Sequence, residues 1–353
     1  MLLRRLGFVL PLLLPLLVVA GYRLGGAWNF LTVGWLFVAL PLADFALGPD
    51  PRPVLEDGRG SAGWARFFDA ILYLWVPLQL ALLVWAAAVF PSLPDLASRA
   101  GLAYSTGVVT GGVGIVVAHE LGHRRRFFER ALGCTLLASV GYAHFYIEHN
   151  KGHHARVATP EDPATARAGE SFWHFLPRTV AGQFASAWRI ERARLAARGL
   201  GPASAANRML WAVAAPLAIV AGLGLWRGAA GVALFVVQAG VAVTLLELVN
   251  YLEHYGLVRR RRADGRYESV TARHSWNSSQ QLSNWFLFNL QRHSHHHAHV
   301  TRHYQELLHM PDAPQLPTGY GGMLVFALVP PLWRRIMDPR LEAWRALDAG
   351  RTP

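Results

Sequence analysis

Cysteine is nearly absent from this chain, and charged residues are scarce. The 353 residues include one cysteine, Cys134, which excludes an internal disulfide framework and an iron site with four cysteine ligands. A metal bound here must be held by nitrogen and oxygen, and any one-electron donor with sulfur ligands must be a separate polypeptide. Charged residues make up 16% of the chain, where a soluble domain has about 25%, and hydrophobic residues make up 53%. This balance predicts an integral membrane protein.

The positive charge does not form a separate basic domain. The formal net charge is +12, but the arginines concentrate beside apolar segments, as in 124–126 and 259–262. Arginines in such places set membrane topology, so we expect no nucleic-acid partner. The sequence has no internal repeat, low-complexity tract or flexible linker, which predicts one membrane domain over residues 1–353.

Six apolar segments are long enough to cross about 30 Å of hydrocarbon, which takes roughly 20 helical residues. The predicted transmembrane helices are 6–24, 28–47, 70–90, 101–118, 210–226 and 230–252. Segment 6–24, with Arg4 and Arg5 before it, can also be interpreted as a signal peptide. The very short loop between it and segment 28–47 instead favours a helical hairpin. Two further apolar stretches, 131–147 and 319–337, can form re-entrant or interfacial helices. The predicted fold class is an all-α membrane protein.

The basic residues indicate the orientation of these helices. They are frequent at the N-terminus and after the second, fourth and sixth helices, with Arg52, Arg59 and Arg66 after the second. The other loops carry one each: Arg23, Arg99 and Arg227. By the positive-inside rule, both termini and the regions 119–208 and 253–353 are expected on the cytoplasmic side of a bacterial-type inner membrane.

Nine of the sixteen histidines fall at four places, where apolar segments end or in polar segments nearby. They are His119 and His123; His149, His153 and His154; His254; and His293, His296 and His297. Histidines three or four residues apart lie on one face of a helix and can hold one ion. Because neighbouring buried imidazoles without partners are costly, the three grouped clusters favour metal binding. For the isolated His254, local sequence leaves a ligand role and a packing role equally open.

The segment from His119 to His123 also fits the zinc metalloprotease motif H-E-x-x-H, in which the glutamate is a general base. One catalytic zinc uses three protein ligands and would leave most of these histidines without a role. Two ions with four or five imidazoles each would use all nine. Imidazole suits iron, copper, nickel and zinc alike, so spacing does not choose the element. An intramembrane zinc protease using His119, Glu120 and His123 stays open as the alternative.

Four ordered motifs carry a family resemblance. HELGH at His119, EHNKGHH at Glu148, NYLEHYGL at Asn250 and LQRHSHHHAH at Leu290 together resemble the membrane-bound alkane 1-monooxygenases. Xylene monooxygenases and fatty acid desaturases are more distant relatives, and action on aromatic methyl or fatty acyl groups is the alternative within this class.

The resemblance implies an activity and a cofactor. It implies hydroxylation of the terminal methyl of medium-chain n-alkanes with O2, at two non-haem irons held by the nine histidines, His254 included. It also implies electrons from rubredoxin, which is served by a rubredoxin reductase. Two positions depart from the family pattern: His295 stands where an acidic residue is usual, and Val300 where a proline is usual. The first makes His295 a residue that can tune the last cluster or compete for metal.

Further residues are expected around the metal centre. Metal-bound imidazoles are oriented through their second nitrogen, and the nearest carboxylates in sequence are Glu120, Glu148, Asp162 and Glu253. A substrate dissolved in membrane lipid would enter between the helices. The apolar residues expected to line this channel, each of which can equally serve as packing, are Trp75, Leu78, Leu82, Val109, Leu245 and Leu248. Basic residues expected to attract an acidic redox carrier are Arg124 to Arg126, Arg192, Arg194, Arg259 to Arg262 and Arg302.

Overall fold

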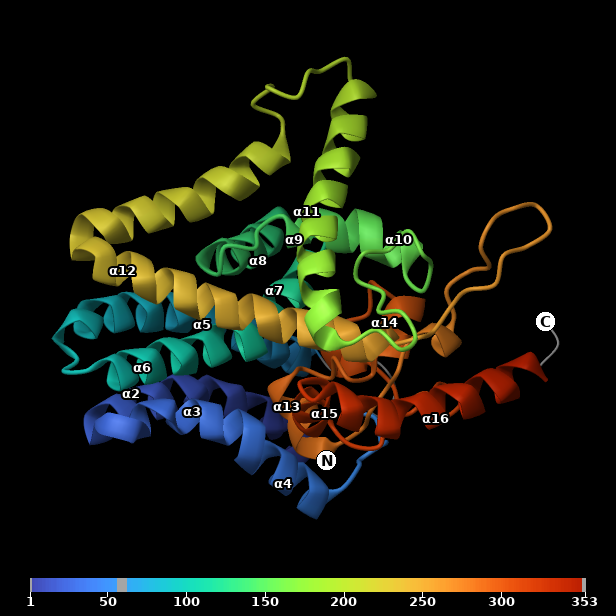
Figure 1. Cartoon of the computed structure of the whole chain (residues 1–353), viewed down its shortest axis with the longest axis horizontal. Helices are drawn as coiled ribbons and strands as arrows, with labels where there is room; N and C mark the ends of the chain where they lie inside the picture. Colours follow the sequence, from blue (N-terminus) through green and yellow to red (C-terminus); the bar gives the residue numbers. More distant parts are fainter. Residues whose placement is uncertain (1, 56–61, 351–353) are drawn as a thin grey trace.

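Helices account for all the regular secondary structure in residues 2–55 and 62–350, the part of the chain that the computed structural model describes (Figure 1). Arg59, one of the arginines used for the orientation, lies outside these residues. Five helical stretches are long and apolar enough to cross a membrane: Leu2–Leu24, Gly26–Leu47, Ala62–Ser92, Leu96–Gly122 and Arg208–His254. The expected all-α membrane fold is confirmed.

The count of six membrane crossings is approximate because the last two predicted helices form one element. Helix α12 runs through Arg208–His254, and only Gly228, with φ 61°, leaves helical geometry. This positive φ is readily adopted by glycine and bends the helix, so its two halves run at an angle in Figure 1. The halves, 208–227 and 229–254, correspond to the two predicted segments.

The first two stretches form the expected helical hairpin. The first consists of α1 (Leu2–Leu6), a 3-10 segment with Pro11 inside (Gly7–Leu13) and α2 (Leu14–Leu24). The second consists of a 3-10 segment (Gly26–Phe30), α3 (Leu31–Gly34), a π-helical segment (Trp35–Ala39) and α4 (Leu40–Leu47). Phe8 is fully buried against Phe68, Phe288 and Tyr304, so the N-terminal helix is part of the core.

The central helices pack backbone against backbone. Helix α5 (Ala62–Val89) is followed by α6 (Leu96–Val109), a π-helical segment (Thr110–Gly114) and α7 (Ile115–Gly122). A Cβ added at Gly107 would lie 2.6 Å from Val241 Cβ, and one at Gly111 would lie 2.5 Å from Ala242 Cα. Small residues four apart allow such close approach between membrane helices. The contact joins α12 to α6 and to the π-helical segment that leads into α7.

The two additional apolar stretches are short helices. Residues 131–147 lie in α8 (Phe127–Ser139) and α9 (Phe145–Glu148), and residues 319–337 lie in α15 (Tyr320–Ala327) and the start of α16 (Pro330–Ala349). At 13 residues, α8 is shorter than the roughly 20 needed to span a bilayer. The long α11 (Phe172–Ala196) runs across the other helices (Figure 1).

Candidate metal centre

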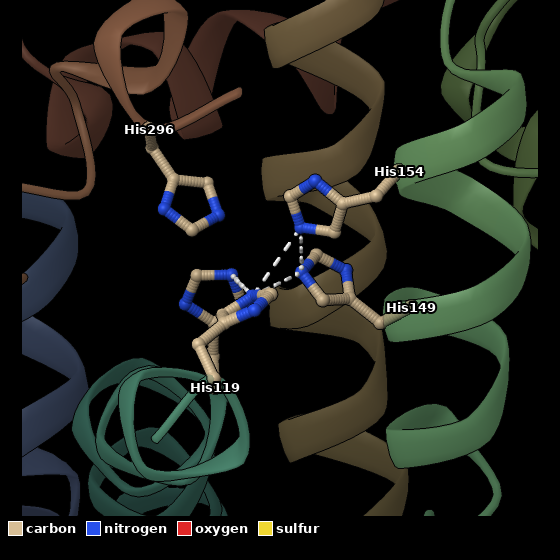
Figure 2. A group of neighbouring side chains, drawn as sticks. His119, His149, His154 and His296 are labelled. Carbon is tan, nitrogen blue, oxygen red and sulfur yellow. Dashed lines mark hydrogen bonds between the residues drawn. The ribbon is translucent and has the colours of Figure 1, made fainter. Parts of the chain in front are cut away.

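Five of the predicted histidines converge at the ends of three separate segments. His119 lies in α7 and His123 directly follows it. His149 begins a π-helical turn and His154 directly follows that turn, and His296 lies in α14 (His293–Ala298). One nitrogen from each lies within 4.8 Å of the others. Figure 2 shows the imidazoles of His119, His149, His154 and His296 pointing toward one another from these segments. We call this set the five-histidine group.

The nitrogen spacings in this group fit a shared cation. The Nε2 atom of His123 lies 3.3 Å from that of His119, 3.1 Å from that of His149 and 3.3 Å from that of His154. A neutral imidazole has one N–H, so it cannot satisfy three such neighbours by hydrogen bonding. Two nitrogens bound to one ion at about 2.1 Å would lie about 3.0 Å apart at a right angle and about 3.4 Å apart at a tetrahedral angle. The residues present therefore fit a metal ion.

The other four predicted histidines form a second group, which we call the four-histidine group: His153, His254, His293 and His297. All four are buried. The Nε2 atom of His293 lies 3.2 Å from that of His254 and 2.9 Å from that of His297. The buried Nε2 of His153 has no hydrogen-bond partner in the described structure, as expected of a nitrogen available to a cation. All nine histidines are thus divided between two adjacent groups, and their role as ligands stays a prediction.

A π-helical turn divides the EHNKGHH motif between the two groups. The turn spans His149–His153 and is followed by α10 (His154–Arg156). Because its hydrogen bonds join residues five apart, His149 and His154 come onto one side, with Nε2 atoms 2.9 Å apart. His153 instead faces the four-histidine group, its ring centre 4.9 Å from that of His254. At Gly152 a Cβ would collide with Glu148 Oε1 and the Arg156 guanidinium, so a larger residue here would displace this ion pair.

Burial keeps these imidazoles in the neutral form that binds metal. Burial, reinforced by the neighbouring His153, lowers the pKa of His123 to about 4. Burial likewise lowers the pKa well below the usual value for five others outside the membrane helices: His149, His154, His293, His296 and His297. The sites therefore need little proton release to accept a cation at neutral pH.

Two of the four carboxylates expected to orient the imidazoles contact them. Asp162 Oδ2 lies 2.9 Å from His153 Nδ1 and accepts a hydrogen bond from Thr165. Burial raises the pKa of Asp162, but His153 and the hydrogen bonds outweigh it and hold that pKa below its usual value. Glu253 Oε1 lies 3.2 Å from His293 Nδ1 and accepts a hydrogen bond from the Tyr320 hydroxyl. Both carboxylates can fix the ring orientation of a histidine in the four-histidine group.

The other two carboxylates pair with arginines. Glu120 lies 2.9 Å from Arg124, and Glu148 lies 2.7 Å from Arg156. Neither hydrogen-bonds to any of the nine imidazoles in the described structure. Arg124, expected on a basic surface, is buried and also contacts Asp69 and His303, so it is unavailable to a redox carrier.

Some contacts of the centre carry no clear signal in the sequence. His254 Nδ1 lies 3.1 Å from the carbonyl oxygen of His274, a backbone group that any residue would supply. The hydroxyl of Tyr320 reaches Glu253 from a helix far along the chain. Only the tertiary fold brings these groups together.

His295, the departure from the family pattern, belongs to neither group. Its ring lies 4.7 Å from that of His299, and its Nδ1 has no hydrogen-bond partner within the described residues. Burial, with the nearby His299, Arg302 and Arg292, lowers the pKa of His295 to about 4. It is therefore neutral, and it contacts neither set of converging nitrogens.

A narrow apolar cavity of about 50 Å³ touches both histidine groups. His119 and His149 of one group and His293 of the other lie on its wall, together with Leu245, which was expected to line a channel. The other expected channel residues, Trp75, Leu78, Leu82, Val109 and Leu248, are not part of this wall. Apolar residues that the sequence did not single out take their place: Leu36, Leu40, Ile115, Val116, Leu246, Val249, Leu287, Leu290 and Leu324. All are ordinary apolar residues of membrane helices, so only the packing distinguishes them.

Comparison with known proteins gives a consistent family. A family model described as fatty acid desaturase matches residues 94–327. Alkane 1-monooxygenase 1 of Pseudomonas aeruginosa is 46% identical over 322 residues, which cover 90% of this chain and 84% of that protein. Alkane 1-monooxygenase 2 of Alcanivorax borkumensis is 39% identical over 323 residues, covering 90% and 84%.

A more distant relative has a different substrate in its name. The hydroxylase component of the xylene/toluene monooxygenase of Pseudomonas putida is 28% identical over 334 residues, covering 92% of this chain and 85% of that protein. The higher identities, the paired histidine groups and the apolar cavity agree with the resemblance that the four motifs indicated. The chain therefore belongs to the alkane 1-monooxygenases within the fatty acid desaturase family.

Proposed function

We propose that this protein hydroxylates the terminal methyl group of medium-chain n-alkanes, using O2 and a centre of two non-haem irons held by the nine histidines. The observation that carries the proposal is one apolar cavity touching two separate groups of converging imidazoles. The similarity to alkane 1-monooxygenases over about nine tenths of the chain supports the substrate class. The reaction takes the alkane, O2, two electrons and two protons to the 1-alkanol and water.

An unactivated C–H bond explains why the site needs metal. Such a bond offers neither an acidic proton nor a leaving group, so acidic, basic or nucleophilic side chains cannot functionalise it. Two reduced irons would supply the electron transfer to O2 that makes C–H oxidation feasible. The five-histidine group would hold one ion and the four-histidine group the other.

The protein's own residues bind, orient and exclude water. Asp162 holds the imidazole of His153 in place through its second nitrogen, and Glu253 lies within ion-pair distance of the second nitrogen of His293. The side chains of Leu36, Leu245 and Leu324 give the cavity an apolar wall that disfavours water, and its volume of about 50 Å³ has room for the terminal carbons of an alkyl chain. A terminal methyl at the histidine end of this cavity lies between the two groups.

Electrons must come from a partner, and we infer that the partner is a rubredoxin with its reductase upstream. The single cysteine rules out a four-cysteine iron centre in this chain. The exposed Arg125, Arg126 and Arg192 remain available to attract an acidic carrier, whereas Arg194 is paired with Glu191. The arginine distribution supports a cytoplasmic position for the histidine groups and both termini.

The geometry of the histidine groups and of Glu120 does not support a zinc protease. His119 and His123 are joined by His149, His154 and His296, which exceeds the three ligands of a catalytic zinc. Glu120, the general base that such an enzyme needs, is held by Arg124 and accepts a hydrogen bond from the backbone N–H of Tyr304.

Adjacent histidines on α14 provide the test. Purified protein reconstituted with rubredoxin, its reductase and iron is given n-octane and ¹⁸O2, and we expect labelled 1-octanol. His296→Ala removes a member of the five-histidine group and should abolish product and lower the iron content. His295→Ala, one residue away and outside both groups, should retain both. His149→Ala and His297→Ala should abolish hydroxylation while leaving a folded membrane protein. Full activity in His296→Ala, or zinc without an O2-dependent product in the wild type, would refute the proposal.

A further inference from the structure

A second and larger cavity reaches the metal centre from the side. Its volume is about 1190 Å³, and it lies between α8 and the first half of α12. These two elements can be followed in Figure 1, where the first half of α12 diverges from the second beyond the bend at Gly228. At its inner end it touches His123 and His154. These are the partly exposed members of the five-histidine group.

The walls of this cavity are mostly apolar, and small side chains line the two facing helices. Alanines line both sides, with Ala131 and Ala138 on α8 and Ala212, Ala215 and Ala218 on α12. Large side chains do not close the gap between the two helices, and the rim residues Phe127 and Trp211 are 79% and 65% exposed. The volume exceeds the roughly 300–1,000 Å³ of pockets that hold drug-sized ligands. An elongated apolar occupant therefore has both space and an entrance.

The charged side chains of the cavity are all cationic. Arg130, Lys151 and Arg208 line it, and no aspartate or glutamate does. None of the three forms an ion pair with a carboxylate in the described part of the chain. Arg130 donates hydrogen bonds to the carbonyl oxygens of Arg124 and Arg125, which anchors it. Glu191, which is not part of the wall, accepts a hydrogen bond from the backbone N–H of Arg208 and is paired with Arg194, so an anion in the cavity would meet three positive side chains.

We propose that this cavity binds an anionic phospholipid of the surrounding bilayer, with its phosphate at Arg130, Lys151 and Arg208 and an acyl chain along the alanine-lined walls. The proposal accounts for the apolar walls as well as the three cationic side chains. A free anion would not need the apolar walls, and an alkane would not need the cations. The acyl chain would also cover His123 and His154, so the lipid keeps bulk water from the exposed side of the five-histidine group.

The single cysteine gives a direct readout that does not depend on enzyme activity. Cys134 lies on the cavity wall, so an acyl chain there should slow its alkylation by N-ethylmaleimide. The rate is measured in discs of neutral phosphatidylcholine and in discs with increasing phosphatidylglycerol. We expect phosphatidylglycerol to protect Cys134 in the wild type.

A pair of double variants tests the charges. Lys151→Gln with Arg208→Gln removes two of the three cations and should raise the phosphatidylglycerol fraction needed for half protection. At about 5-fold per charge, the expected shift for two charges is about 25-fold. The matched control, Arg189→Gln with Arg192→Gln, removes two exposed charges from α11 outside the cavity and should behave like the wild type. Each variant is scored against its own rate in neutral discs, because Arg208 itself lowers the pKa of Cys134 against the raising effect of burial.

Each other outcome overturns the proposal. Equal protection by the two lipids would show that charge plays no part. Equal shifts in both double variants would indicate a general surface-charge effect rather than a site. Protection by inorganic phosphate in neutral discs would indicate an anion site without an acyl chain.

Discussion

Replacing Asp162 by asparagine should weaken one metal site selectively. Asp162 is fully enclosed, and its Oδ2 lies 2.9 Å from Nδ1 of His153, the member of the four-histidine group that comes from the EHNKGHH motif. Asparagine keeps the size and one acceptor oxygen but removes the negative charge that strengthens the imidazole as a donor to metal. Loss of such an outer contact typically costs 10- to 100-fold in metal affinity, or about 1.4–2.7 kcal/mol.

The assay is iron retention during titration with a chelator of known affinity. For the wild type we expect two release steps, and for Asp162→Asn one of them should shift by about 10- to 100-fold while the other stays in place. Glu170→Gln is the matched control, because Glu170 is a nearby carboxylate paired with Arg178 rather than with a histidine. Unchanged release in Asp162→Asn, or an equal shift of both steps, would refute the orienting role of Asp162.

Three further predictions concern packing, substrate and pH. Gly111→Ala should destabilise the protein by about 1–3 kcal/mol, seen as a lower melting temperature in detergent, because the new Cβ would lie 2.5 Å from Ala242 Cα. Gly112→Ala meets nothing within 4 Å and should not lower that temperature; equal losses would contradict the close contact. Leu245→Ala enlarges the narrow cavity and should shift the product distribution toward longer 1-alkanols in a competition between n-alkanes, whereas an unchanged distribution would place the substrate elsewhere. In the metal-free protein, the pKa of His123 falls from 6.5 to about 4 on folding, so the free energy of unfolding should be constant above pH 6.5 and decrease as the pH falls toward 4. A melting temperature that rises as the pH falls from 6.5 toward 4 would contradict the conclusion that the His123 imidazole is buried and neutral.

The sequence predicts the membrane helices well because length and apolarity are local properties. Residues 6–24 and 28–47 lie within observed helices of nearly the same extent. Two predicted helices are one kinked helix, α12, in the structure. The sequence could not distinguish these cases, because a glycine between apolar segments is equally compatible with a loop and with a kink, as at Gly228. Histidine spacing likewise selects nine residues that the structure gathers into two groups.

The outer contacts of the site could not be predicted in the same way. Glu120 and Glu148 are nearest to the histidines in sequence, but they form ion pairs with Arg124 and Arg156, four and eight residues later, instead of contacting the imidazoles. Asp162 is farther along the chain and reaches His153 because the segment after α10 folds back. The channel residues depend on which helix faces which, and Leu245 was one of many apolar candidates. The i, i+4 spacing of Glu120 and Arg124 is a local signal, whereas the missing information in the other cases is tertiary.

The π-helical turn at His149–His153 has a consequence for how the centre is assembled. One short stretch of backbone supplies His149 and His154 to one group and His153 to the other. An ion that binds His149 and His154 therefore stabilises the turn that also positions His153, and the second ion meets a backbone already ordered. We expect an ion in the five-histidine group to raise the affinity of the four-histidine group for the second ion, while each group keeps its own release step. Insertion or deletion of one residue in this turn should abolish both sites together.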